Sequence, residues 1–156
     1  MVQMSSTQTD RIEKEILLKA PRARVWRAIA DPKEFGTWFG VAFDGVFAPG
    51  QPHRGKITTK GYDHLTMEIY VERIEPERLF SFRWHPYDVD LSADLSGEPT
   101  TLVTFTLEEV PEGTRLTIVE SGFDAIPLSR RAEAFRMNES GWGEQIRNIE
   151  RHVARK

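Results

Sequence analysis

Apolar and polar residues alternate with a period of two near the start of the chain. Between residues 11 and 19, Ile12, Ile16 and Leu18 fall on one face, with acidic residues on the other. This alternation is typical of a half-buried strand. Lys14 interrupts the apolar face, which favours a position at the edge of a sheet.

Two short helices are predicted after this strand. Pro21 is well placed to open the first, because proline is tolerated in the first helical turn. The pair Asp31-Pro32 ends that helix and opens the second, since aspartate caps helix N-termini. The second helix is expected to end at Gly40.

From residue 41 to residue 122 the period is again two. The turn-forming sequences PGQP, KGYD, EPER and PEG separate the alternating segments, and no helical period intervenes. This arrangement predicts an antiparallel meander. The predicted strands are 41–47, 53–60, 65–74, 79–85, 101–108 and 114–121.

The clearest pattern is an apolar stripe near the end of the chain. Apolar residues recur at steps of three and four from Leu128 to Val153, which predicts one helix of about seven turns. Such a helix buries its stripe on the apolar face of a neighbouring sheet. We therefore predict an α+β fold: a curved antiparallel sheet of about seven strands wrapped on the long helix, with two short helices after the first strand.

Length and composition limit the architecture and the kind of function. A chain of 156 residues fits one domain and not two, so we expect a flexible tail at 1–10 and a single domain at 11–156. The absence of cysteine excludes disulfides, zinc–thiolate sites and a thiol nucleophile.

Charge and targeting signals narrow the partners. The net charge is −3 and the basic residues are interleaved with acidic ones, which argues against nucleic-acid binding. The polar N-terminus lacks the apolar core of a signal peptide, and no apolar run approaches the ~18 residues of a membrane span. The cytoplasm is the expected location, and the sequence leaves the oligomeric state open.

Several short segments are informative through their order and spacing. They are Ala20-Pro21, Val25-Trp26, Asp31-Pro32, Trp38-Phe39-Gly40, Ile74-Glu75-Pro76-Glu77-Arg78-Leu79, Trp84, Thr104-Phe105-Thr106-Leu107, Gly113-Thr114-Arg115-Leu116-Thr117, Ser121-Gly122-Phe123 and Gly141-Trp142. As a set they resemble the START-like, helix-grip (SRPBCC) superfamily of lipid-transfer and polyketide-cyclase-like proteins. Within it, the chain is similar to the branch named for the activator of heat-shock protein 90 ATPase.

The resemblance covers nearly all of the chain from Arg11 to Val153. It implies a curved sheet that grips the long helix, with a cavity between them. It brings no catalytic motif. It also does not make this chain a chaperone activator, because the eukaryotic activators carry an additional N-terminal domain for which 156 residues leave no room.

Polar residues interrupt two of the predicted apolar faces. Glu120 continues the apolar face of its strand, and Glu139 interrupts the helical stripe, with Asn138 beside it. A dry buried carboxylate is very costly, so we interpret these residues as lining a cavity. The alternative is that Glu120 lies at a frayed strand end and Glu139 at the solvent margin of the helix. With aromatic walls added, the candidate ligand-binding residues are Trp38, Trp84, Glu120, Phe135, Asn138, Glu139 and Trp142.

Two glycines flank Trp142 within the predicted helix. Each of Gly141 and Gly143 costs about 1 kcal/mol relative to alanine in a helix. We interpret them as marking a close approach of the helix to the sheet. A bend that lets the helix shift and admit a ligand is the alternative.

The sequence offers little support for familiar catalytic chemistry. There is no GxSxG elbow, no phosphate-binding loop and no GxGxxG turn. The four histidines (His53, His64, His85 and His152) have no metal-ligand spacing, so no metal or organic cofactor is expected.

Three functions follow from these observations. The leading hypothesis is binding of a small hydrophobic ligand in an internal cavity. The second, which the resemblance implies, is a protein-interaction module that docks a chaperone or a regulator. The third is a cofactor-independent cyclase or hydrolase in which Glu120 and Glu139 share the cavity and act as acid and base.

Overall fold

A computed structural model of the chain describes residues 11–43, 45–61, 65–85 and 99–154. The predicted tail at 1–10 lies outside these residues. None of the described helices is both long and apolar enough to cross a membrane.

The described strands form one antiparallel sheet in the order β1-β7-β6-β5-β4-β3-β2. The meander predicted from the period of two is confirmed, and the first strand returns to pair with the last one. Among the described residues this gives seven strands, as predicted. The strands are β1 (Arg11–Leu18), β2 (Val41–Phe43), β3 (Pro52–Ile57), β4 (Thr66–Glu75), β5 (Leu79–Trp84), β6 (Thr101–Val110) and β7 (Gly113–Ser121).

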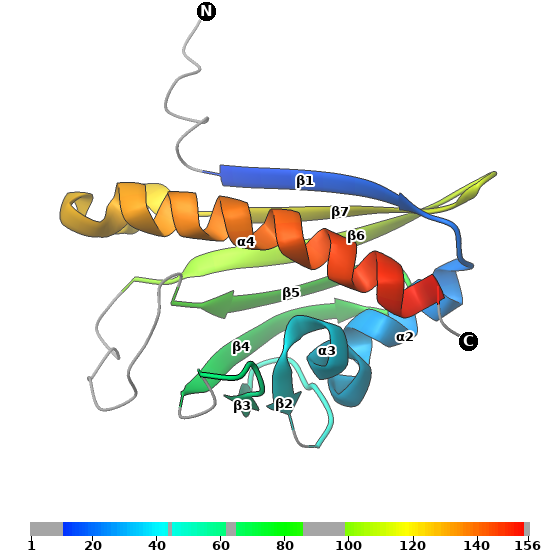
Figure 1. Cartoon of the computed structure of the whole chain (residues 1–156), viewed down its shortest axis with the longest axis horizontal. Helices are drawn as coiled ribbons and strands as arrows, with labels where there is room; N and C mark the ends of the chain where they lie inside the picture. The colour runs from blue at the N-terminus through cyan, green and yellow to red at the C-terminus, as the bar shows by residue number, and fades with distance from the viewer. Residues whose placement is uncertain (1–10, 44, 62–64, 86–98, 155–156) are drawn as a thin grey trace, which may run out of the picture.

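The helices cover one face of this sheet (Figure 1). The long helix α4 (Leu128–Ala154) runs across it, and the short helices α2 (Arg22–Ala30) and α3 (Pro32–Phe39) lie beside the C-terminal half of α4. A short 3₁₀ turn, η1 (Phe123–Ala125), precedes α4. The predicted α+β helix-grip architecture is therefore confirmed.

The capping chemistry expected for the second short helix is present. The Asp31 side chain accepts a hydrogen bond from the backbone N–H of Lys33, and Pro32 occupies the first turn. Gly40 ends α3 in the left-handed conformation (φ 92°), which costs glycine little. This tight ending fixes the direction in which the last side chains of α3 point.

Aromatic rings fill most of the space between α3 and the sheet. Phe35 is fully buried, and its ring centroid lies 4.9–6.4 Å from seven other aromatic rings. Phe47, expected inside the second strand, lies beyond the end of β2 and packs on Phe35 at 5.8 Å instead. Close packing of this kind leaves little internal volume at the α3 end of the sheet.

The buried face of α4 differs from the predicted stripe. Leu128 is 79% exposed, whereas Ala134 is fully covered. The face continues through the half-buried Asn138, and the neighbouring Glu139 is exposed. The predicted stripe runs through Glu139, but Asn138 occupies the half-buried position instead, because a hydrogen-bonded amide can be buried at small cost. In its C-terminal half the prediction is confirmed, since Trp142, Ile149 and Val153 are buried.

Candidate functional site

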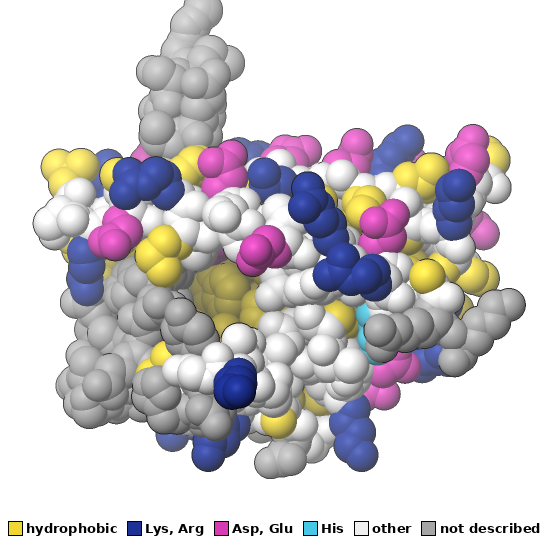
Figure 2. Space-filling view, in the orientation of Figure 1, with side chains coloured by type: hydrophobic (Ala, Val, Ile, Leu, Met, Phe, Trp, Pro, Cys, Tyr) yellow, Lys and Arg dark blue, Asp and Glu magenta, His cyan; other side chains and the backbone are white. Residues whose placement is uncertain are grey.

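A small pocket lies below α4, where this helix meets the end of α3 and the last residue of β5. Figure 2 shows a recess with an apolar floor below the middle of α4. The pocket has a volume of about 80 Å³. Its walls are Phe39, Trp84, Asn138, Gly141, Trp142 and Gln145.

Three aromatic rings from three different elements form one side of the pocket. The ring centroids of Trp84 and Trp142 are 5.7 Å apart, with their planes inclined by 33°. The Phe39 ring lies 5.9 Å from each of them. These distances are normal for aromatic packing, so the three rings form a continuous wall.

A buried glutamate joins the two tryptophans. Glu120 of β7 has no exposed surface, because it lies in the inward register of its strand, opposite Val103 of β6 and Ile12 of β1. The indole N–H groups of Trp84 and Trp142 both donate to its carboxylate, each at 2.8 Å.

Two further donors complete the surroundings of this carboxylate. The hydroxyl of Thr101 donates to Oε2 of Glu120 at 2.5 Å. The side-chain amide of Asn138 donates to both carboxylate oxygens, at 3.0 and 2.9 Å. Strands β5, β6 and β7 and helix α4 are therefore cross-linked at one point, directly behind the pocket wall.

The environment of Glu120 changes its acidity. Burial raises the pKa of this carboxyl, and hydrogen bonds from Thr101, Trp84, Trp142 and Asn138 offset the rise only in part. Since the folded-state pKa is above the unfolded-state value, the titration of Glu120 favours folding below the unfolded-state pKa. That contribution is lost as the pH rises through the folded-state pKa.

The structure brings four of the seven sequence candidates together. Trp84, Asn138 and Trp142 line the pocket, and Glu120 hydrogen-bonds to all three of them. Of the two alternatives for Glu120, a frayed strand end does not fit its complete burial.

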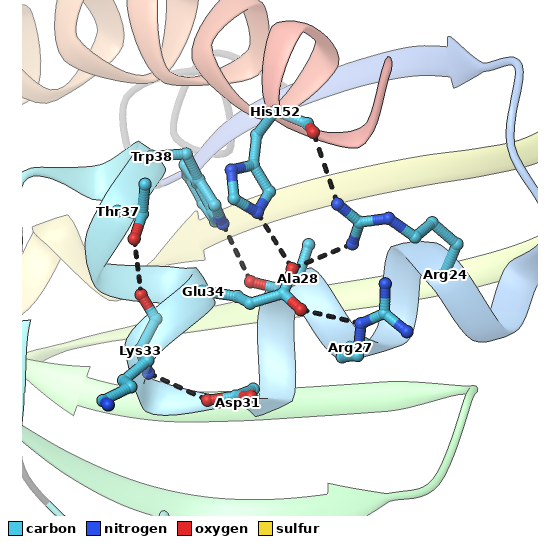
Figure 3. Close-up of polar contacts among 9 residues, drawn as sticks. All are labelled: Arg24, Arg27, Ala28, Asp31, Lys33, Glu34, Thr37, Trp38 and His152. Carbon is cyan, nitrogen blue, oxygen red and sulfur yellow. Dashed lines mark hydrogen bonds and ion pairs between the residues drawn. The ribbon is translucent and has the colours of Figure 1, made fainter. Parts of the chain in front are cut away.

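The other three candidates lie elsewhere. Trp38 is buried, but its indole N–H donates to the backbone carbonyl of Ala28 at 2.8 Å and ties α3 to α2 (Figure 3). Phe135 packs against Phe123 at 5.2 Å. The side chain of Glu139 is 54% exposed, and its carboxylate lies 4.0 Å from the ammonium of Lys14. Glu120 and Glu139 therefore do not share a cavity, which removes the geometric basis of the acid–base hypothesis.

Phe39, Gln145, Gly141 and Thr101 belong to this site but were not among the candidates. Phe39 follows Trp38 directly, and helical periodicity does not decide which of two adjacent aromatics faces the pocket. The Gln145 amide donates to the Phe39 carbonyl at 3.1 Å, a contact between distant segments that no local pattern reveals.

The two glycines of α4 are not sites of close packing. A Cβ atom added at Gly141 or at Gly143 would meet no neighbouring atom within 4 Å. The predicted close approach to the sheet is therefore wrong. Gly141 instead lines the pocket, one helical turn from Asn138 and one from Gln145, so its missing side chain leaves space there.

A separate ion-pair cluster fastens the C-terminal end of α4. Glu34 of α3 accepts hydrogen bonds from Arg24 at 2.9 Å and Arg27 at 2.7 Å, and His152 Nε2 lies 2.9 Å from its carboxylate (Figure 3). Partial burial alone raises the pKa of Glu34. The hydrogen bonds from His152, Arg27 and Arg24 outweigh that effect and hold the pKa below its ordinary value.

The lowered pKa of Glu34 gives a prediction for stability against pH. The folded-state pKa is below the unfolded-state value, so the stabilisation is present above the unfolded-state pKa and is lost as the pH falls through the folded-state pKa. Glu34→Gln should lower the free energy of unfolding by about 1 kcal/mol at neutral pH. The difference from wild type should shrink once the pH falls below about 4.5.

Urea unfolding at a series of pH values measures this difference. The exposed Glu133, which lies on α4, provides the control, and Glu133→Gln should show no comparable loss. A difference between wild type and Glu34→Gln that grows towards acid pH would contradict the assigned direction.

The described residues contain no group of three or more His, Asp or Glu side chains arranged to hold a metal ion. The chemistry available in the pocket is that of aromatic faces and two neutral amides.

A curved antiparallel sheet gripping one long helix, with a pocket between them, defines a helix-grip protein of the SRPBCC class. The family model described as activator of Hsp90 ATPase homolog 1-like protein matches residues 19–154, and the chain belongs to this family. No curated protein matches the sequence.

Solved structures share the fold. Protein MLL2253 from Mesorhizobium loti is 24% identical over 94% of this chain and 98% of its own, with a TM-score of 0.73. A solution structure from Arthrobacter aurescens is 22% identical over 96% and 88%, with a TM-score of 0.75. DynU16, from the dynemicin biosynthetic locus, is 26% identical with a TM-score of 0.70, and the match covers 94% of this chain and 48% of DynU16.

Proposed function

We propose that this protein binds a small, largely hydrophobic molecule in the pocket below α4. The observation that carries the proposal is the wall formed by Phe39, Trp84 and Trp142, with the two indoles fixed from behind by Glu120. Proteins of this family and fold commonly bind hydrophobic ligands, which supports the proposal.

The free-energy cost of burying Glu120 argues for a role beyond packing. Replacing a buried charged group by a well-packed apolar residue is often neutral or stabilising. A buried carboxylate that binds two indole rings and the amide of Asn138 therefore costs more free energy than an apolar side chain in the same place. Its benefit is a preorganised wall, because a ligand that meets fixed side chains loses less entropy on binding.

The volume of the pocket limits the size of the ligand. About 80 Å³ is room for several water molecules, because one water needs at least about 10–15 Å³ of such cavity volume. The ligand is therefore a small molecule, or one end of a larger molecule whose remainder stays outside. Two polar wall residues, Asn138 and Gln145, would orient a polar group next to the apolar part.

The four tryptophans allow a direct test by NMR. A small neutral ligand, 3,3-dimethylbutan-1-ol, should shift the indole N–H signals of Trp84 and Trp142 in a saturable manner. The signals of Trp38, bonded to Ala28, and of Trp26 provide internal controls that should not move.

Native mass spectrometry of gently purified protein complements this titration. A reproducible small-molecule adduct that is released on denaturation would identify the class of the natural ligand. A bare mass, together with pocket indole signals that respond to no small organic molecule, would contradict the proposed function.

A further inference from the structure

Among the described residues that hydrogen-bond to Glu120, none carries a positive charge. Trp84, Thr101, Asn138 and Trp142 are all neutral donors. Lys14 projects from β1, the strand next to β7, but its ammonium is paired with the exposed Glu139 at 4.0 Å. Buried carboxylates are normally accompanied by a positive charge.

The hydrogen bonds themselves select the ionised form of Glu120. An ionised carboxylate only accepts hydrogen bonds, and its four partners donate to it. A protonated carboxyl would have to donate one hydrogen bond as well. Indole and amide N–H groups do not accept, so only the hydroxyl of Thr101 could receive that proton. The hydrogen-bond donors thus favour the negative charge and oppose the effect of burial, which favours the neutral acid.

This negative charge acts on the pocket through the two indole rings. Tryptophan is the best aromatic partner for a cation, which binds over the face of the ring. An anion at the N–H edge of an indole polarises the ring towards its faces and strengthens this attraction. Trp84 and Trp142 are both polarised in this way, by the same carboxylate.

The remaining pocket walls would accept a cation without repulsion. Phe39 adds a third aromatic face, and the other walls are Asn138, Gly141 and Gln145. In the part of the chain that the structure describes, no basic side chain lines the pocket. The pocket volume of about 80 Å³ is of the size of a compact head group.

We propose that the pocket recognises a small organic cation, namely a methylated ammonium group, held against the faces of Trp84, Trp142 and Phe39 and neutralised by Glu120 behind them. This inference rests on the proposed function and specifies the ligand class for the same pocket. The apolar body of the ligand would extend from the ammonium group towards the pocket opening.

A pair of molecules with the same shape and different charge tests the proposal. Choline carries a trimethylammonium group, and 3,3-dimethylbutan-1-ol carries an uncharged tert-butyl group in its place. We expect choline to bind at least about tenfold more tightly, with shifts of the same two indole signals. Equal affinities, or tighter binding of the alcohol, would overturn the cation proposal while leaving the proposed function intact.

The source of the ammonium group is tested in a parallel titration. Dihexanoylphosphatidylcholine, used below its micelle concentration, presents the same head group on a lipid. Tighter binding of this lipid than of choline supports a lipid head group as the ligand, and tighter binding of choline supports a free metabolite. If choline, the lipid and the alcohol all fail to bind, both the inference and the proposed function are wrong.

The role of the Glu120 charge is tested separately from that of the aromatic wall. Glu120→Gln keeps the size of the side chain and removes the charge, so choline affinity should fall to about that of the alcohol. If this variant does not fold, a pH series on the wild-type protein provides the same information. Choline affinity should rise with pH as Glu120 ionises, whereas the affinity for the alcohol should stay constant.

Few other titratable groups among the described residues could produce a pH dependence of choline binding. Within this part of the chain, Glu120 lies opposite Ile12 of β1 and accepts hydrogen bonds from β5, β6 and α4. None of these side chains is ionisable, and the charged pair between β1 and α4 is Lys14 with Glu139. A Glu139→Gln variant that retains the pH dependence assigns it to Glu120. A choline affinity independent of pH, in a protein that prefers neither molecule, would refute the proposal.

Discussion

Glu120→Ala should lower the free energy of unfolding by about 3 kcal/mol or more, which is a large fraction of the stability of a domain. The substitution leaves the indole N–H groups of Trp84 and Trp142 without an acceptor, together with the donors of Thr101 and Asn138. An unsatisfied buried donor typically costs about 1–3 kcal/mol. Relief of the buried charge offsets part of this loss.

The matched control for this prediction is Glu139→Ala. Both glutamates interrupt apolar patterns in the sequence, but the Glu139 side chain is half exposed, so its removal should change stability by no more than about 0.5 kcal/mol. Urea unfolding of the two variants measures both effects. A loss below about 1 kcal/mol for Glu120→Ala would show that the carboxylate does not hold the four donors in place.

Gly141→Ala should weaken ligand binding by about tenfold or more while leaving the protein at least as stable as wild type. The new methyl group meets no neighbouring atom, so helix propensity alone predicts a gain of about 1 kcal/mol. The same methyl group stands between Asn138 and Gln145 on the pocket wall. In about 80 Å³, one methyl group removes a substantial part of the space.

Gly143→Ala provides the control on the same helix. A Cβ atom at Gly143 also meets open space, and Gly143 is not among the pocket-lining residues. It should therefore gain stability to a similar extent and keep ligand affinity. Choline and 3,3-dimethylbutan-1-ol titrations, with thermal unfolding, separate the two variants. Equal affinities in both would show that ligands do not occupy this pocket.

The fold could be predicted because local patterns determined most of its elements. The alternation of apolar residues predicted the strands, and the Asp31-Pro32 pair predicted the start of α3, where Asp31 does cap the helix. Phe47 shows the limit of this reasoning. It keeps the apolar phase of a strand, but its ring is buried against Phe35 after β2 has ended.

The site could be predicted only in part, for reasons that particular residues illustrate. The sequence predicts Glu120 as a site residue because it is a polar residue in the apolar phase of a strand, where alternate side chains face the same side. Glu139 gave the same signal on α4 and is exposed, because a helical face is wider than one residue per turn. The side chain of Asn138, one position earlier, lies at the position on the helix that faces the sheet.

No pattern in the sequence predicts the contact of Gln145 or the open space beside Gly141. The side chain of Gln145 is held in place by its hydrogen bond to the Phe39 carbonyl, 106 positions away in sequence. Gly141 was noticed, but a glycine is compatible with both a tight contact and an open space. Only the positions of the surrounding side chains decide between a tight contact and an open space. Sequence periodicity carries no information on those positions.

The shared carboxylate also has an evolutionary consequence. Trp84, Thr101, Asn138 and Trp142 come from three different elements and depend on a single acceptor, Glu120. Loss of that acceptor leaves all four donors unsatisfied, so the effects of substitutions within this group are far from additive. The five positions are therefore constrained to change together. A lineage that replaces Glu120 by an apolar residue needs new acceptors for these donors, or residues without such donors in their place.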